Sequence, residues 1–221
     1  MKKTVLLFSL LGFSSLFVLS VASAEPLTNM DVFELEVAAD IQISPDGERI
    51  AYVRRSMDVM QDATRSNIWL IDSDGDNHRP LLSGVENYSS PRWSPDGQNI
   101  VFSANRNGDF EIRVDGAEIW SVSVIDASLT QLTDRQGADF SPVYSPDGKR
   151  IAFRGTPDNR MAYQHADIYL LDIASGESRV IDEDLDRHFS RVAWVNNQKQ
   201  MVSYNDRGIG AVLPRTETAP G

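Results

Sequence analysis

Short apolar strands recur along this chain at a nearly constant spacing, and the same polar turn introduces each of them. The tetrapeptide Ser-Pro-Asp-Gly begins at Ser44, Ser94 and Ser145, so its copies lie 50 and 51 residues apart. Two polar residues and an apolar strand follow each copy. The three strands open with Ile50-Ala51-Tyr52, Ile100-Val101-Phe102 and Ile151-Ala152-Phe153. A sequence period of this length indicates a repeat protein.

A second strand motif recurs in phase with the first. Alternating, aromatic-bearing strands are expected at residues 67–72, 118–122 and 167–172, and a turn and a short further strand follow each of them. Every repeat therefore contains four strands joined by tight turns, which is the composition of one β-propeller blade. A β-sandwich with similar hairpins is the alternative, but two phased motifs in three copies favour the propeller.

The residues of the recurring turn suit a tight hairpin. Proline presets φ at the second position, aspartate bonds back to the local backbone, and glycine adopts a positive φ. We therefore assign a structural role in the blade turns to Asp46, Gly47, Asp96, Gly97, Asp147 and Gly148.

A fourth, degenerate copy of the repeat follows the third. Trp194 lies 50 residues after Tyr144, and residues 195–198 replace the tetrapeptide. We predict an all-β fold with about three and a half four-stranded blades over residues 41–212 and a polar tail over 213–221. Closed propellers typically have four to eight blades. The expectation is thus an incomplete propeller, either part of a longer reading frame or closed by another copy.

The first 40 residues have a different pattern. Lys2 and Lys3 precede an almost wholly apolar stretch from Thr4 to Val21, and Ala22-Ser23-Ala24 follows. This is typical of a bacterial signal peptide over residues 1–24, although the stretch approaches the length of a membrane anchor. The prediction is a periplasmic or secreted protein without a membrane segment after cleavage. Residues 25–40 are expected to form a lead-in helix, with Thr28 and Asp31 as a capping box.

Charge and composition exclude several classes of partner. The chain has 221 residues, a net charge of -11 and no cysteine. Such acidity argues against nucleic-acid binding, which needs a basic surface, and against anionic lipid surfaces. It also keeps an exported protein soluble. The absence of cysteine excludes disulfides and thiolate metal sites.

Candidate metal-binding and ligand-binding groups are weak. Asp72, Asp74 and Asp76 alternate as in a calcium loop, but Asn77 and Ser83 stand where an EF-hand needs glycine and glutamate. We predict no metal site and no cofactor there. The three histidines lack metal-ligand spacing and are expected on surface loops: His78, His165 and His188. The tryptophans recur in phase and are expected to fill the space between blades: Trp69, Trp93, Trp120 and Trp194.

Two polar loops occupy the same phase in successive repeats, at residues 105–109 and 156–160. Loops between the second and third strands lie on one rim of a propeller. Arg106 and Arg160 are the candidates for rim contacts with a peptide carboxylate, because the arginine fork matches a carboxylate. Ordinary solvated turns are the alternative.

The Ser-Pro-Asp-Gly strand unit with its downstream Asp167–Asp172 motif resembles the WD-like propeller repeat. That repeat occurs in TolB and in the prolyl oligopeptidase family of serine peptidases. The segment Leu27–Leu35 leading into the first blade looks like the start of exported acylaminoacyl-peptidase or dipeptidyl-peptidase-like members, whereas TolB places a separate α/β domain before its propeller. The resemblance covers roughly residues 26–210.

The resemblance implies a substrate-gating propeller of an exported serine peptidase. In that family the catalytic triad belongs to an α/β-hydrolase domain with a Gly-x-Ser-x-Gly elbow, and this sequence contains no such pentapeptide. We therefore predict no catalytic residues in this chain, and peptide substrates reached through a hydrolase domain outside it. The alternative is a non-enzymatic, TolB-like propeller that binds a protein partner.

Overall fold

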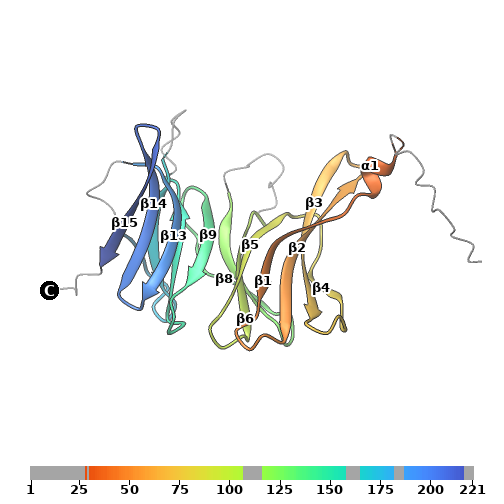
Figure 1. Ribbon diagram of the computed structural model, residues 1–221, viewed down its shortest axis with the longest axis horizontal. Helices are drawn as coiled ribbons and strands as arrows, with labels where there is room; N and C mark the ends of the chain where they lie inside the picture. Colours follow the sequence, from red (N-terminus) through yellow and green to blue (C-terminus); the bar gives the residue numbers. More distant parts are fainter. Residues whose placement is uncertain (1–27, 29, 107–115, 158–164, 182–186, 217–221) are drawn as a thin grey trace, which may run out of the picture.

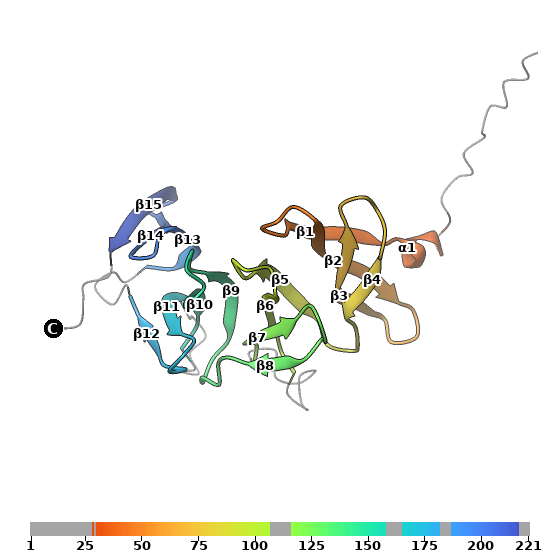
Figure 2. The ribbon, with the colours of Figure 1, turned by 90° about the horizontal axis from the view of Figure 1, so that it is seen from below.

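Four antiparallel sheets follow one another along an open arc (Figure 1, Figure 2). The computed structural model describes residue 28 and residues 30–106, 116–157, 165–181 and 187–216. The elements in chain order are α1 (Asp31–Glu34), β1 (Val37–Ile43), β2 (Arg49–Asp58), β3 (Ala63–Asp72), β4 (Arg79–Leu82), β5 (Tyr88–Trp93), β6 (Asn99–Ala104), β7 (Glu118–Ser123), β8 (Leu129–Gln131), β9 (Asp139–Tyr144), β10 (Arg150–Gly155), β11 (Asp167–Asp172), β12 (Ser178–Val180), β13 (Phe189–Asn196), β14 (Lys199–Asp206) and β15 (Ile209–Thr216).

Each sheet is one blade, in which sequential strands pair with their neighbours. Blade 1 has the order β1-β2-β3-β4, blade 2 β5-β6-β7-β8 and blade 3 β9-β10-β11-β12, while blade 4 contains β13-β14-β15. The predicted all-β arc of four-stranded blades is confirmed, and the last described blade has three strands.

The repeat also governs local irregularities in the backbone. The first strand of blades 1, 2 and 3 carries a break in register against the second strand. In each case a non-glycine residue with positive φ occupies the same phase, namely Asp40, Ser90 and Ser141 at 46°, 55° and 53°. This is the geometry of a β-bulge, which increases the local twist of a strand. The strand bulges, and the local twist that they produce, therefore recur with the sequence repeat, as the turns do.

The core lies between blades. One apolar cluster joins Ile68 of blade 1 to Phe102 of blade 2. A second joins Val101 of blade 2 to Phe153 of blade 3, and a third joins blade 3 to Phe189 of blade 4. Each blade thus buries its apolar side chains chiefly against the next blade, which is how repeat architectures gain stability.

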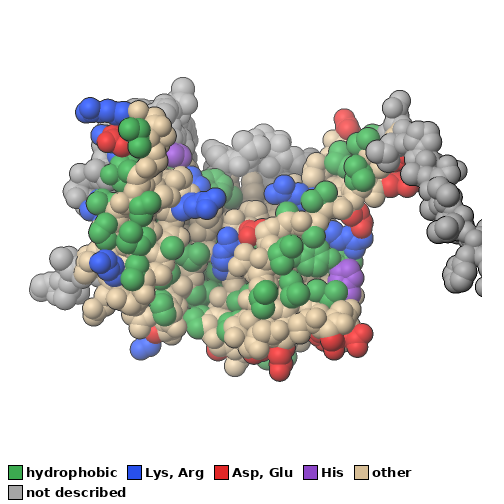
Figure 3. Space-filling view, in the orientation of Figure 1, with side chains coloured by type: hydrophobic (Ala, Val, Ile, Leu, Met, Phe, Trp, Pro, Cys, Tyr) green, Lys and Arg blue, Asp and Glu red, His purple; other side chains and the backbone are tan. Residues whose placement is uncertain are grey.

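Apolar side chains are exposed on the fourth blade. Val195, Ile209 and Val212 are 54%, 72% and 62% exposed. Hydrophobic side chains are visible over this end of the arc (Figure 3). In a closed propeller a neighbouring blade covers such a face.

Two predicted boundaries are wrong. Among the described residues of the expected lead-in helix, only those of α1 are helical, and β1 begins at Val37 because that residue pairs with Arg55 of β2. Residues 213–216 of the expected tail belong to β15, in which Leu213 pairs with Val202 and Pro214 with Met201, and the rest of that tail lies outside the described residues. Proline is tolerated there because β15 is an edge strand, where no ladder partner needs its missing N–H.

The predicted signal peptide lies outside the described residues. Within the part of the chain that the structure describes, no helix has the length and apolar character needed to cross a membrane.

Candidate functional site

The recurring turns all lie on one rim, along the lower edge of Figure 1. In the first of them the Ser44 hydroxyl donates to Asp46 Oδ1 at 2.5 Å, which also accepts from the backbone N–H of Glu48 at 3.1 Å. Gly47 has a φ of +77°. These hydrogen bonds, with that from Ser44 foremost, hold the pKa of the Asp46 carboxyl below its ordinary value.

The other two turns repeat this geometry. Ser94 and Ser145 donate to Asp96 and Asp147 at 2.5 and 2.6 Å. Gly97 and Gly148 have φ values of +68° and +70°. The three turns therefore share one hydrogen-bond pattern and one backbone conformation.

The turns of successive blades also stack on one another. A Cβ atom built on Gly97 would lie 3.7 Å from Cδ of Pro45, and one on Gly148 would lie 3.5 Å from Cδ of Pro95. The proline of one turn therefore sits beside the glycine of the next, which links the blades along this rim.

The second strands of the blades end at the opposite rim. Arg106 follows β6 there and donates to the Tyr88 hydroxyl at 2.7 Å. Its guanidinium also lies 3.8 Å from Glu86 and 5.5 Å from the Trp120 ring centroid. Arg106 is thus engaged by its own blade. Arg160, the second predicted contact residue, lies outside the described residues.

A cluster that sequence reasoning missed lies on the same side, between blades 2 and 3. The Thr133 hydroxyl donates to Glu118 Oε2 at 2.5 Å and accepts from the backbone N–H of Ile119 at 2.9 Å. Arg135 Nη1 donates to Asp139 Oδ1 at 3.3 Å. Asp139 is fully buried and Glu118 is 6% exposed. Two carboxyl groups and one guanidinium are therefore enclosed together.

Glycine and aromatic rings make room for this cluster. The Arg135 guanidinium lies 3.7 Å from the centroid of the Tyr169 ring. A Cβ atom on Gly155 would approach Arg135 Nη1, Asp139 Oδ1 and Tyr169 Cε2 to 2.8 Å each. The absence of a side chain at position 155 is therefore a condition for this packing.

Burial changes the acidity of both carboxyl groups. It raises the pKa of Asp139 to about 7, an effect that Arg135 opposes and the negative charge of Glu118 reinforces. Burial likewise raises the pKa of Glu118, against a hydrogen bond from Thr133. Asp139 Oδ2 has no well-aligned partner among the described residues. The pair can therefore hold a proton near neutral pH, a property found often at functional sites and also in structural networks.

The repeat phase contains the signal that would have found this cluster. Asp139 lies 51 residues after Tyr88 and 50 before Phe189. Each of these residues starts the first strand of its blade. Tyr88 and Phe189 are both buried aromatic residues. Among blades 2 to 4, only blade 3 therefore has a carboxyl group in place of this core aromatic residue.

The histidines and the alternating aspartates make local contacts. His78 lies 2.6 Å from the Tyr52 hydroxyl, and His165 lies 3.2 Å from Asp167. His188 Nδ1 accepts from the backbone N–H of Ala166 at 3.2 Å, and burial lowers the pKa of its ring. Asp72 accepts a hydrogen bond from the side chain of Asn77. Within the described residues, no three His, Cys, Asp or Glu side chains are placed to hold a metal ion.

Three of the four tryptophans pack against the apolar clusters that join blades, as predicted. Trp93 and Trp194 pack against the clusters that join blade 1 to blade 2 and blade 3 to blade 4. Trp120 packs against the first of these clusters. Trp69 is half-buried, and its ring lies 5.0 Å from that of His78.

Comparison with known proteins places these features in a family. Among curated relatives, an uncharacterized peptidase from Bacillus subtilis, YuxL, is 32% identical over 125 residues, which cover 57% of this chain and 18% of the relative. The Tol-Pal system protein TolB of Anaeromyxobacter dehalogenans is 36% identical over 111 residues, covering 50% of this chain and 22% of the relative. The chain thus spans about a fifth of the length of these relatives.

Solved structures share the fold at low sequence identity. An acylaminoacyl peptidase from Pyrococcus horikoshii superposes with a TM-score of 0.62 at 16% identity, over 85% of this chain and 32% of the other. A putative TolB from Agrobacterium tumefaciens superposes with a TM-score of 0.55 at 17% identity, over 81% and 76%. The model of the PD40 family, the TolB beta propeller domain, matches residues 42–213. With its phased turns, inter-blade core and four sheets, this chain belongs to the PD40 family of β-propellers.

Proposed function

We propose that this chain is the propeller part of an exported serine peptidase, in which it admits peptides to a separate α/β-hydrolase domain and performs no bond cleavage itself. The observation that carries the proposal is the 32% identity to a peptidase over 125 residues. In this proposal the propeller acts as a filter, so the residues that matter are those of its rims and loops.

The contacts of the described residues support a non-catalytic role. A serine nucleophile needs a base within hydrogen-bonding reach. In the described segments, His78 and His188 are engaged by Tyr52 and Ala166, and no serine hydroxyl bonds to a histidine ring. The buried carboxyl pair Glu118–Asp139 can store a proton, but it is enclosed, and the Thr133 hydroxyl beside it is buried as well and accepts from the backbone N–H of Ile119.

The experiment that tests the proposal combines an activity assay with covalent labelling. The purified chain is incubated with chromogenic acyl-peptide and dipeptide substrates and with a serine-reactive phosphonate, beside an active serine peptidase as control. We expect neither turnover nor labelling of this chain, and peptide binding detectable by NMR shifts at rim residues. Labelling of a serine in this chain would overturn the proposal.

A TolB-like role in protein binding is the second candidate, because TolB is 36% identical over 111 residues. It predicts that a folded protein partner, and not short peptides, binds the propeller. Crosslinking in the envelope of a bacterium that exports the chain separates the two candidates. Recovery of a hydrolase domain supports the peptidase role, and recovery of a non-catalytic envelope protein supports the TolB-like role.

A further inference from the structure

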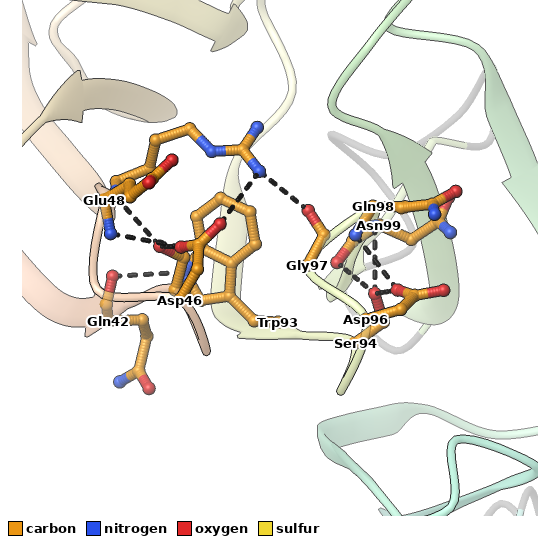
Figure 4. Close-up of polar contacts among 11 residues, drawn as sticks. Gln42, Asp46, Glu48, Trp93, Ser94, Asp96, Gly97, Gln98 and Asn99 are labelled. Carbon is orange, nitrogen blue, oxygen red and sulfur yellow. Dashed lines mark hydrogen bonds and ion pairs between the residues drawn. The ribbon is translucent and has the colours of Figure 1, made fainter.

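Two arginines tie blade 1 to blade 2 on the turn rim. Arg49 Nη2 donates to the Gly97 carbonyl oxygen at 3.1 Å, and its guanidinium lies 5.3 Å from the Trp93 ring centroid (Figure 4). It also lies 3.9 Å from Asp46 Oδ2. Arg79 Nη2 reaches the carbonyl oxygen of Val124 at 3.4 Å. At this junction the arginine guanidinium groups therefore contact a carboxylate, an aromatic face and backbone carbonyl oxygens.

The junction between blades 3 and 4 follows the same plan. Arg150 stands at the phase of Arg49, lies 5.4 Å from the Trp194 ring centroid and donates to the carbonyl oxygen of Asn197. Arg179 pairs with Leu170, as Arg79 pairs with Leu70 in blade 1. Blades 1 and 3 therefore share an arginine, a leucine and a second arginine at three equivalent positions.

Blade 2 departs from this plan at all three positions. Asn99 replaces the first arginine, Ser121 the leucine and Thr130 the second arginine, as the strand registers show. All three residues line a cavity of about 390 Å³ between blades 2 and 3. Gly148 and Ile173 line it too, and they are the counterparts of the carbonyl acceptors Gly97 and Val124. The cavity therefore occupies the place that arginine side chains fill at the first junction.

The groups that contact an arginine guanidinium between blades 1 and 2 have counterparts in this cavity. Asp96 corresponds to Asp46, and Tyr144 corresponds to Trp93; both line the cavity. Asp96 lies close enough to Tyr144 for its charge to help raise the pKa of that phenol, after the larger effect of burial. An arginine charge helps to lower the pKa of Asp46 and Asp147, whereas hydrogen bonds account for the lowering at Asp96.

We propose that the cavity between blades 2 and 3 binds a guanidinium group, presented as an arginine side chain by a peptide or protein. Asp96 supplies the negative charge, the Tyr144 ring supplies an aromatic face, and the Gly148 carbonyl supplies an acceptor. A planar guanidinium uses all three at once, whereas an ammonium is a compact point charge and does not stack in this way. The acidic chain, with a net charge of -11, also attracts cationic ligands.

NMR titration of the purified chain tests this site. The probes are methylguanidinium chloride, the tripeptide Gly-Arg-Gly with blocked ends, and the matched tripeptides with lysine or leucine at the centre. We expect saturable shifts around Asn99, Ser121 and Gly148, with a dissociation constant of the order of 1 mM, for methylguanidinium and for the arginine peptide. If the arginine peptide binds more tightly than methylguanidinium, the natural ligand is an arginine of a peptide. If the two bind equally, the natural ligand is a free guanidinium compound.

Variants distinguish this cavity from general attraction to an acidic surface. Asn99→Arg restores the residue of blades 1 and 3, so we expect a folded protein that binds the arginine peptide at least about tenfold more weakly. Gln98→Arg adds the same charge at an exposed neighbouring position and should leave binding unchanged. Asp96→Asn keeps the turn acceptor but removes the charge, and should weaken binding several-fold.

Three results would overturn the proposal. They are no saturable shift with any guanidinium probe, equal response to the arginine, lysine and leucine peptides, and unchanged binding by Asn99→Arg. A loss of binding in Gln98→Arg equal to that in Asn99→Arg would also count against it. Because the labelling assay of the proposed function does not involve this cavity, failure of either proposal can be recognised without the other.

Discussion

The indole Nε1 of Trp93 donates a hydrogen bond to the carbonyl oxygen of Gln42 at 3.1 Å, and so joins the first strands of blades 1 and 2. Trp194 makes the same bond to Val143 between blades 3 and 4. Tyr144 occupies the equivalent position in blade 3. The tryptophans of this phase thus act as donors to the preceding blade in addition to filling the space between blades.

Replacement of Trp93 by phenylalanine should destabilise the fold. It removes the bond to Gln42 and leaves a half-buried carbonyl without that partner, at a cost of about 1 kcal/mol. Trp120 offers a matched control, because its buried Nε1 has no hydrogen-bond partner among the described residues. The free energies of unfolding of both variants can be measured by urea titration. Equal losses in Trp93→Phe and Trp120→Phe would contradict the role of the inter-blade bond.

Replacement of Gly97 by alanine should also cost stability. At a φ of +68° an L-residue is strained, so we expect a loss of about 1–2 kcal/mol. Gly210→Ala is the control, because it lies in edge strand β15, and a Cβ there meets nothing within 4 Å. Thermal unfolding of the two variants provides the comparison, and the prediction fails if the Gly97 variant melts at the same temperature as the control.

The buried carboxyl pair predicts a pH dependence of stability. The pKa of Asp139 is raised from 3.8 to about 7, so the folded state holds a proton that the unfolded state releases within this window. Its contribution to stability is therefore fully present below pH 4 and is lost as the pH rises towards 7. The expected loss is a few kcal/mol, since one pKa unit corresponds to about 1.4 kcal/mol.

The variant Asp139→Asn isolates this effect. An amide does not titrate, so the variant should lose most of the decline in stability between pH 4 and 7. Asp134→Asn is the control, because Asp134 is exposed and only adds to the raised pKa of Glu118. Urea titrations at several pH values measure both. A pH slope that persists unchanged in Asp139→Asn would assign the effect to other groups.

Amide hydrogen exchange should be fastest in blade 4 among the described strands. Strand β15 pairs only with β14, and the fourth sheet contacts blade 3 on one side only. Elements with few neighbours open at lower free energy. We expect β15 amides to exchange well before those of β6, whose side chains are almost all buried. Uniform protection from β6 to Val212 would contradict this prediction.

The blade architecture was predictable because the same sequence pattern occurs in several copies. The turn residues, the strand phase and the core positions recur at 50 and 51 residues, so each copy supports the others. The end of the helix and the end of the last strand were not predictable in this way. Val37 and Leu213 take their structure from pairing with Arg55 and Val202, which lie elsewhere in the chain.

The candidate sites were missed for a related reason. A repeat predicts the features that its copies share. The buried acid cluster and the cavity arise at positions where one copy differs from the others. Asp139 stands where blades 2 and 4 have an aromatic residue, and Asn99, Ser121 and Thr130 stand where blades 1 and 3 have large side chains. The effect of these departures depends on the neighbouring blade, because Gly155 and Arg135 enclose Asp139 only in the folded arc.

The recurring turn has a consequence for the chemical ageing of the protein. An Asp-Gly bond isomerises when the glycine nitrogen attacks the aspartate side chain, a reaction that proceeds most readily in flexible chains and through the protonated acid. In these turns the Gly47 N–H is held by the Ser44 carbonyl oxygen at 2.9 Å, and the Asp46 side chain is held by the Ser44 hydroxyl. Gly97 and Gly148 are held in the same way by Ser94 and Ser145. The folded propeller should therefore resist isoaspartate formation at these three Asp-Gly bonds, and damage there would report time spent unfolded.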